Sequence, residues 1–365
     1  MRYPLKRDRA VIKVEVDGVD VSSRMAPHLI SVVVTDFEGS AMDTCAIELD
    51  DSYGLLAVPP DNADLSVSFG WVGENVQNVF KGKIVDVSSK CQRRSGRILV
   101  IEGTGASQTD DGKAQVSQSW GEGQPAEGEG KKIKLSTVLE EAAKKAGVQF
   151  KASEALGNIE RDYWAQTNES FHNFADRMAR EVGGVFKVQG NEASLTSSVE
   201  NKNADGESLS DIMCAWGKNL IAWNIHPKVA RPQFKETAQM WFNDKGGKWE
   251  SVKKAVGLGG GAGAMSQAIH YGLFPHATKD QAENAAQSDA NASARNAGTG
   301  WVVINGEPAA KGGGTAIVKG ARSGVDDSYR IMEAEHAWNR KSGYQTRLSL
   351  GLPGATMGGN VTPEF

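Results

Sequence analysis

The sequence predicts a mainly β protein with an α+β insert: two antiparallel β-barrels and, between them, a small α+β domain. Three observations support this fold class. The first 105 residues have strand patterns almost throughout, with apolar and polar side chains alternating in segments separated by turn residues. The middle of the chain has the spacing of amphipathic helices instead, and the strand pattern returns from about residue 205.

The first barrel is predicted over residues 1–108. Val11–Val16 alternates apolar and polar side chains from Ile12 onward, and Asp17-Gly18 then supplies a turn. Leu65, Val67, Phe69 and Trp71 share one face of a later strand. The candidate strands are Val11–Val16, Ile30–Thr35, Thr44–Leu49, Leu65–Trp71, Phe80–Val87 and Arg97–Glu102. Their short spacing, with Gly, Pro, Asn and Asp between them, favours a small barrel or sandwich.

Residues 109–133 are predicted to be a linker or long loop. Residues 121–130 are rich in Gly and Glu and cannot bury a core. The short basic run Lys131-Lys132-Ile133-Lys134 favours a solvated turn over a nucleic-acid patch.

A small α+β domain is predicted over residues 134–200. Ser136 is a candidate N-cap of a helix, and Gly147 occupies the position expected of a C-terminal glycine. A second helix is expected to begin near Asn168-Glu169 and to end at Gly183-Gly184. A hairpin over 185–195 then completes the domain.

The second barrel is predicted over residues 201–352. Thr278 and Gln281 form a capping box that begins a helix near 279–296. Residues 353–365 are Gly-rich and are expected to form a flexible C-terminal tail. The candidate strands of this domain are Asn219–Ile225, Phe234–Phe242, Trp249–Val252, Trp301–Ile304, Thr315–Val318, Tyr329–Trp338 and Thr346–Leu350.

The composition is that of an ordinary globular protein. The 365 residues suffice for two or three domains, and a formal charge of −4 gives no sign of a duplex-binding surface. Cys45, Cys91 and Cys214 are too sparse for a disulfide framework or a zinc site. Neither a secretory signal nor an apolar run of membrane-spanning length is present, so we expect folding in a reducing cytoplasm and no membrane anchor.

Candidates for chemistry are few. His270 and His276 could hold a metal, but no third ligand with suitable spacing accompanies them. Glu333, Glu335 and His336 are neighbours on a predicted strand, whose successive side chains point to opposite faces. The glycine run 257–263 lacks the Lys-Ser or Lys-Thr of a phosphate cradle. We therefore predict no catalytic residue, no cofactor-binding residue and no metal ligand.

Two features leave other functions open. Pairs among the 45 acidic residues could serve a glycosidase if they lie at the right separation. The nine tryptophans could line a sugar-binding surface, although barrel cores and subunit interfaces are the commoner use of tryptophan. These tryptophans are Trp71, Trp120, Trp164, Trp216, Trp223, Trp241, Trp249, Trp301 and Trp338.

An ordered series of short motifs resembles the late control protein D family, the baseplate hub proteins of contractile-tailed, Mu-like phages. The resemblance covers roughly residues 10 to 350, although each motif is weak by itself. The motifs are Val16-Asp17-Gly18-Val19-Asp20-Val21, Val34-Thr35-Asp36-Phe37-Glu38-Gly39, Ile47-Glu48-Leu49-Asp50-Asp51, Phe69-Gly70-Trp71, Phe80 to Asp86, Gln166 to Val188, His276 with the Ala-rich helix that follows it, Asn305-Gly306-Glu307-Pro308, and Glu335-His336 to Thr346.

The resemblance implies a structural role. It suggests tail-tube-like barrels and a homotrimer that joins a six-fold tail tube, or its initiator protein, to a three-fold spike among other baseplate proteins. Genomic DNA would pass through the lumen without specific binding. The expected location is the virion tail, after assembly in the host cytoplasm. Alternatives are the hub of a tailocin or type VI secretion spike, a tail-associated cell-wall or glycan hydrolase, and a carbohydrate-binding module.

Overall fold

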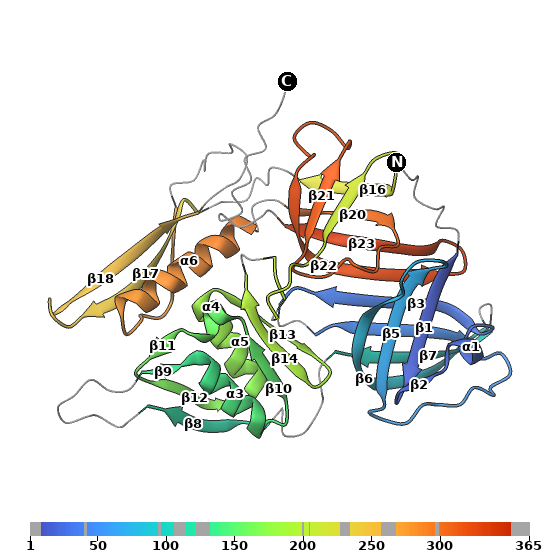
Figure 1. Cartoon of the computed structure of the whole chain (residues 1–365), viewed down its shortest axis with the longest axis horizontal. Helices are drawn as coiled ribbons and strands as arrows, with labels where there is room; N and C mark the ends of the chain where they lie inside the picture. The colour runs from blue at the N-terminus through green and yellow to red at the C-terminus, as the bar shows by residue number, and fades with distance from the viewer. Residues whose placement is uncertain are drawn as a thin grey trace.

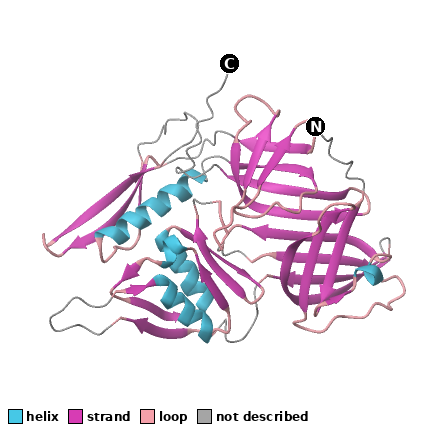
Figure 2. Ribbon diagram, viewed as in Figure 1, coloured by secondary structure: helices cyan, strands magenta, loops and turns pink. Residues whose placement is uncertain are grey.

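The computed structural model describes residues 9–39, 42–93, 96–105, 114–121, 132–198, 201–203, 205–226, 234–256, 268–295 and 299–351. Two β units lie side by side, the first below and the second above at the right of Figure 1. An α+β domain and a helix-backed sheet lie beside them. Apart from the short helix α1 (Ser22–Met25), the helices of the described residues lie in these two neighbouring parts (Figure 2). The predicted mainly β fold with an α+β insert is confirmed.

The first unit contains all six predicted strands. Its strands are β1 (Ala10–Val16), β2 (Val19–Asp20), β3 (Leu29–Phe37), β4 (Thr44–Asp50), β5 (Asp64–Trp71), β6 (Gln77–Gln92) and β7 (Gly96–Thr104). The alternating pattern buries one face of each strand: Leu65, Val67 and Phe69 are almost completely buried, while Ser66 and Ser68 are only partly covered. Burial of this apolar face is what selects the strand register.

The α+β domain is built around two helices and several short strands. These elements are β8 (Val116–Trp120), β9 (Ile133–Lys134), α3 (Leu135–Lys145), β10 (Gln149–Ala152), α4 (Glu154–Gly157), β11 (Glu160–Arg161), β12 (Trp164–Glu169), α5 (Phe171–Val182), β13 (Gly184–Gln189) and β14 (Glu192–Ser197). Val138, Leu139, Phe174 and Met178 from the two helices meet in one core, as their helical spacing predicts.

Two details of this domain differ from the expectation. The predicted linker 109–133 contains the strand β8, which pairs with β12; its mostly polar residues hid it. Ser136 lies inside α3 and is not its N-cap, since the cap position is Lys134 and no side chain caps it. By contrast, Ser170 caps α5 by accepting a hydrogen bond from the Asn173 N–H, and Gly183 ends that helix with φ 73°.

The second unit contains β15 (Asp211–Ala215), β16 (Leu220–His226), β20 (Thr299–Asn305), β21 (Thr315–Lys319), β22 (Ser328–Asn339) and β23 (Gly343–Gly351). Its core comes from the inner faces of these strands, for example Ile212, Val302, Ile331 and Leu348. The paired strands of the two units form one 13-stranded sheet. Among the described residues its pairing runs as an open path from β16 to β2.

The range predicted as one second barrel also holds a separate layer, inserted between β16 and β20. This layer comprises β17 (Glu236–Asn243), β18 (Lys248–Ala255), β19 (Ile269–Tyr271) and α6 (Lys279–Arg295). The Thr237 hydroxyl donates to the Ala286 carbonyl at 2.7 Å, which fixes α6 on the sheet. Thr278 accepts from the Gln281 N–H at the start of α6, as the capping box predicts.

Candidate functional site

The two β units follow the same strand path. In the first unit the paired order is β1-β5-β6-β7-β4-β3, and in the second it is β15-β21-β22-β23-β20-β16. If the six strands of each unit are numbered 1 to 6 along the chain, leaving out the short β2, both units have the spatial order 1-4-5-6-3-2. One difference exists: β15 pairs with β21 in parallel, whereas β1 pairs with β5 antiparallel. The chain therefore carries the same β unit twice.

The repeat extends to irregularities in the strands. The register shifts between Leu29 and Ser31 on β3, and between Leu220 and Ala222 at the corresponding place on β16. A second matching pair of shifts lies on β6, between Ile84 and Asp86, and on β22, between Ile331 and Glu333. Bulges are local features that re-aim a strand, so two shared bulges indicate that the units are equivalent residue by residue.

A strand joint connects the two units within the chain. β22 pairs with β21 through Ser328–Arg330 and then, beyond its bulge, with β3 through Glu333–Asn339. In this joint His336 lies opposite Val34 and Asn339 lies opposite Ser31. We take this joint as the candidate functional site, because it sets the geometry between the repeated units.

Buried ion pairs surround the end of β3 at this joint. The Arg330 Nε donates to the Glu38 carboxylate at 2.7 Å, and both side chains are more than 90% buried. Lys187 of the α+β domain contacts the carboxylates of Asp36 and Asp43. These contacts connect β3 both to the second unit and to the α+β domain.

Electrostatics at the Lys187 cluster favour the charged ammonium group. Burial opposes its charge, but the carboxylates of Asp36 and Asp43 outweigh burial and raise the pKa of Lys187. Burial raises the pKa of Asp43 in spite of the Lys187 charge. A buried cation with two carboxylate neighbours is costly to disrupt, because removing one partner leaves uncompensated charge.

His336 lies where the cores of the two units meet. Its Nε2 is 3.0 Å from the Ala310 carbonyl, an acceptor only, so we assign the proton to Nε2. Nδ1 then accepts from the Tyr344 hydroxyl at 2.8 Å. Tyr344 in turn stacks on Phe69 of the first unit with ring centroids 4.6 Å apart. Burial lowers the pKa of His336 to about 4, so its imidazole is neutral near pH 7.

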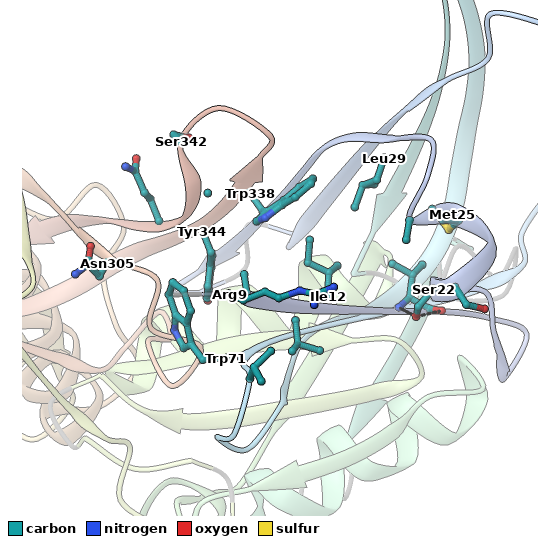
Figure 3. A pocket seen from close by; sticks show the side chains of 18 residues that line it. Arg9, Ile12, Ser22, Met25, Leu29, Trp71, Asn305, Trp338, Ser342 and Tyr344 are labelled. Carbon is teal, nitrogen blue, oxygen red and sulfur yellow. Dashed lines mark hydrogen bonds between the residues drawn. The ribbon is translucent and has the colours of Figure 1, made fainter. Parts of the chain in front are cut away.

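A cavity of about 750 Å³ opens between β1 and the turn from β22 to β23. Trp71, Trp338 and Tyr344 line it (Figure 3). Arg9 is the one charged residue among the described residues that line it. The described residues of this mainly apolar wall include neither a carboxylate nor a histidine, so they supply no acid–base pair.

The other residues considered from sequence do not gather into a reactive site. His270 lies on β19 beside the Phe234 ring, and His276 Nε2 is 3.3 Å from the Gln239 amide oxygen. Glu333 and Glu335 lie on β22 beside His336, whose two ring nitrogens contact Tyr344 and Ala310 instead. In the described part of the chain, no group of three His, Cys, Asp or Glu side chains is placed to hold a metal.

The cysteines and tryptophans divide between core and surface. Cys45 and Cys214 are buried, and burial raises the pKa of Cys214 to about 12, whereas Cys91 is exposed. Most tryptophans are wholly or partly buried, but Trp216 and Trp249 are more than half exposed. The glycine run 257–263, Lys131 and the tail 353–365 lie outside the described residues. No described helix is long and apolar enough to cross a membrane.

No pattern in the sequence predicts the contacts of the joint residues Asp36, Glu38, Lys187 and Arg330. Asp36 and Glu38 follow the apolar run of β3, and polar residues at a strand end ordinarily indicate solvent. Their partners lie about 150 and 290 positions further along the chain, so no local pattern connects them.

This fold is similar to that of solved phage tail proteins. The structure is similar to a 43 kDa tail protein of prophage MuSo2 from Shewanella oneidensis, with TM-score 0.68, 13% identity, and 95% of this chain and 99% of that one covered. A tail protein of Neisseria meningitidis MC58 gives TM-score 0.66 at 12% identity, covering 94% and 97%. An Escherichia coli type VI secretion component gives TM-score 0.52 at 10% identity, covering 95% and 77%.

Sequence comparison gives more particular relatives. The probable baseplate hub protein of Escherichia phage P2 is 23% identical over 196 residues, which is 54% of this chain and 47% of that protein. The corresponding protein of Escherichia phage 186 is 26% identical over 190 residues, 52% and 46% respectively. The aligned part thus spans about half the length of the curated relatives. No family model matches the chain. The resemblance to phage baseplate hub proteins is confirmed.

Proposed function

We propose that this chain is the structural hub of a phage tail baseplate, a trimeric adaptor between a six-fold tail tube and a three-fold central spike. The observation that carries the proposal is the duplicated β unit. Three copies of a chain with two equivalent units present six units in a ring. Such a ring can match six-fold symmetry on one face, while the rest of each chain keeps three-fold symmetry.

The proposed partners follow from this position. They are the spike protein, the tube or tube-initiator protein, and other baseplate proteins, in a particle assembled in the bacterial cytoplasm. Genomic DNA would pass through the ring without specific binding. We expect the lumen to be neutral or acidic, because a strongly basic wall would retain the phosphate backbone.

We propose no enzymatic step. The proposal is supported by the hub role named for the relatives, and by the contacts of His336 with Tyr344 and Ala310 rather than with Glu333 or Glu335. The alternative in another class is a tail-associated cell-wall or glycan hydrolase. A zymogram against cell walls distinguishes them, since clearing by the isolated protein would favour the hydrolase.

A second candidate within the structural class is the hub of a tailocin or a type VI secretion spike. The fold similarity to the Escherichia coli secretion component favours keeping this candidate. Genomic neighbours separate the two: capsid and terminase genes indicate a phage, and their absence indicates a tailocin.

Native mass spectrometry tests the hub proposal. We expect a species of three times the chain mass of 39.0 kDa, either alone or with the spike protein present. A stable dimer or tetramer under both conditions would contradict the proposed three-fold symmetry.

A further inference from the structure

The strand joint between the two units forms once within the chain. Each strand of this joint has an equivalent in the other unit, and these two equivalents could form a second joint. The joint uses β3 of the first unit and the second half of β22. The equivalent of β3 in the second unit is β16, and the equivalent of β22 in the first unit is β6. A joint between β16 and the second half of β6 would therefore be of the same kind.

The equivalence can be followed residue by residue. Val32 of β3 pairs with Ile47 of β4, and at the equivalent position Trp223 of β16 pairs with Val302 of β20. Counting from the shared bulges, Thr35 corresponds to His226, and Glu335 corresponds to Ser88. Both long strands also donate at the same place before their bulges: Ile84 N–H to the Ala63 carbonyl, and Ile331 N–H to the Gly314 carbonyl, each at 2.9 Å.

Both strand edges needed for the second joint are free in the described part of the chain. β16 pairs with β20 along one edge only, apart from a single bridge from Leu220 to Trp216. On β6, β5 covers one edge as far as Lys83 and leaves that edge unpaired from Asp86 onward. Unpaired edges are templates for pairing with another strand, and proteins ordinarily cover or blunt them.

Residues on the free edges of β16 and β6 are less buried than their equivalents on β3 and β22, as expected for strand edges that lack a partner. Val32, Val34 and His336 are completely buried in the joint within the chain. Their equivalents on the free edges are less covered: Trp223 and Ile225 are only partly buried, and Ser89 is exposed. The free edges therefore retain room for the contact that β3 and β22 already make.

We propose that β16 of one copy pairs antiparallel with the second half of β6 of the next copy, and so repeats the β3–β22 joint between chains. The register transferred from that joint places Ser88 opposite His226, Ser89 opposite Ile225, Lys90 opposite Asn224, and Cys91 opposite Trp223. This inference rests on the proposed function, which supplies the ring of three chains, and it identifies the β16–β6 pairing as the contact between neighbouring chains.

A second copy of this chain is the occupant that the structure favours for each edge. The two edges belong to equivalent partners of a joint that the chain itself already makes, so the new contact continues an existing geometry. They lie in different units and use different strands, which makes the contact head-to-tail. Such a contact generates a ring when the rotation closes.

Disulfide trapping tests the register. Lys90 and Asn224 are both exposed, and their equivalents Ala337 and Val33 face each other in the existing joint. We would introduce Lys90→Cys and Asn224→Cys together in a Cys91→Ser background and oxidise the intact protein. Cross-strand neighbours have Cβ atoms close enough for a disulfide, so we expect linked dimers and trimers on a non-reducing gel.

The matched control shifts one position by a single residue. Ser89→Cys with Asn224→Cys, in the same background, places the two thiols on opposite faces of the proposed sheet. We expect at least about tenfold less linked product from the control pair. Equal linking by both pairs would overturn the register.

Native mass measured on the same samples separates this inference from the hub proposal. Trimers that show no Lys90–Asn224 linkage would overturn the β16–β6 contact and leave the hub proposal standing. An absence of both trimers and linkage would count against both. Linkage only after addition of a tube protein, with that protein in the linked product, would assign the edges to a different partner and overturn the contact.

Discussion

His336 is a buried, neutral imidazole whose two nitrogens are both occupied, and its burial affects stability through pH. Its pKa is about 4 in the folded protein, against an ordinary value of 6.5. Between these values the unfolded chain binds a proton that the folded chain does not, so the unfolding free energy falls as the pH falls from 6.5 to 4. Above pH 6.5 the contribution is complete.

We therefore predict a loss of about 3 kcal/mol of unfolding free energy over this range from His336 alone. Because other groups titrate too, the measurement is a difference between the native chain and His336→Gln, whose amide also has a donor and an acceptor but does not titrate. Urea unfolding at a series of pH values should give a flatter profile for the variant. Parallel profiles would contradict the assignment.

Lys187 makes a second prediction at the scale of single residues. Lys187→Met leaves Asp36 and Asp43 buried with no cation, so we expect a loss of about 3–5 kcal/mol in urea unfolding. Lys151→Met is the matched control, because the Lys151–Asp205 pair is more than half exposed and solvent screens its attraction, so its loss should change the unfolding free energy far less. Similar losses in both variants would mean that burial of the Lys187 cluster is not what stabilises it.

Helix α5 shows at the scale of elements how a cap acts. Ser170 accepts from the Asn173 N–H at 3.3 Å, whereas Ser136 makes no capping bond in α3. Ser170→Ala should cost about 1 kcal/mol of unfolding free energy. Ser136→Ala should stay within about 0.5 kcal/mol. Equal losses for the two variants would show that the capping bond adds nothing to α5.

The elements themselves were largely predictable because their signals are local. Alternation fixed the strands around Val14, Phe69 and Leu348, and helical spacing fixed α5 and α6. β8 gives little strand signal because most of its residues are polar. The prediction of Ser136 as an N-cap is wrong, because a capping residue is not recognisable without the geometry of the preceding turn. The candidate site depends on pairings such as Glu38 with Arg330, which only the folded chain brings together.

At the scale of the whole molecule, the sequence predicts two similar β domains. Only the strand order shows that β16 and β6 are the equivalents of the paired strands β3 and β22. The register of β3 against β22 shows which backbone groups face the joint. The Glu38 N–H donates to the Met332 carbonyl at 2.8 Å, so alternate residues of β22 from Met332 onward face β3. By the equivalence of the units, Ser89 directs its N–H out of the free edge of β6, and Ser88 directs its N–H toward β7.

This alternation gives a prediction for the assembly. Ser89→Pro removes an N–H that no strand of the same chain uses, and proline is tolerated on an edge whose N–H faces outward. The monomer should keep its circular dichroism spectrum, while its association, followed by native mass spectrometry against protein concentration, should weaken. Ser88→Pro should instead lose a bond to β7 and destabilise the fold by about 3 kcal/mol or more. Undiminished association of a folded Ser89→Pro protein would show that this edge of β6 is not where the copies meet.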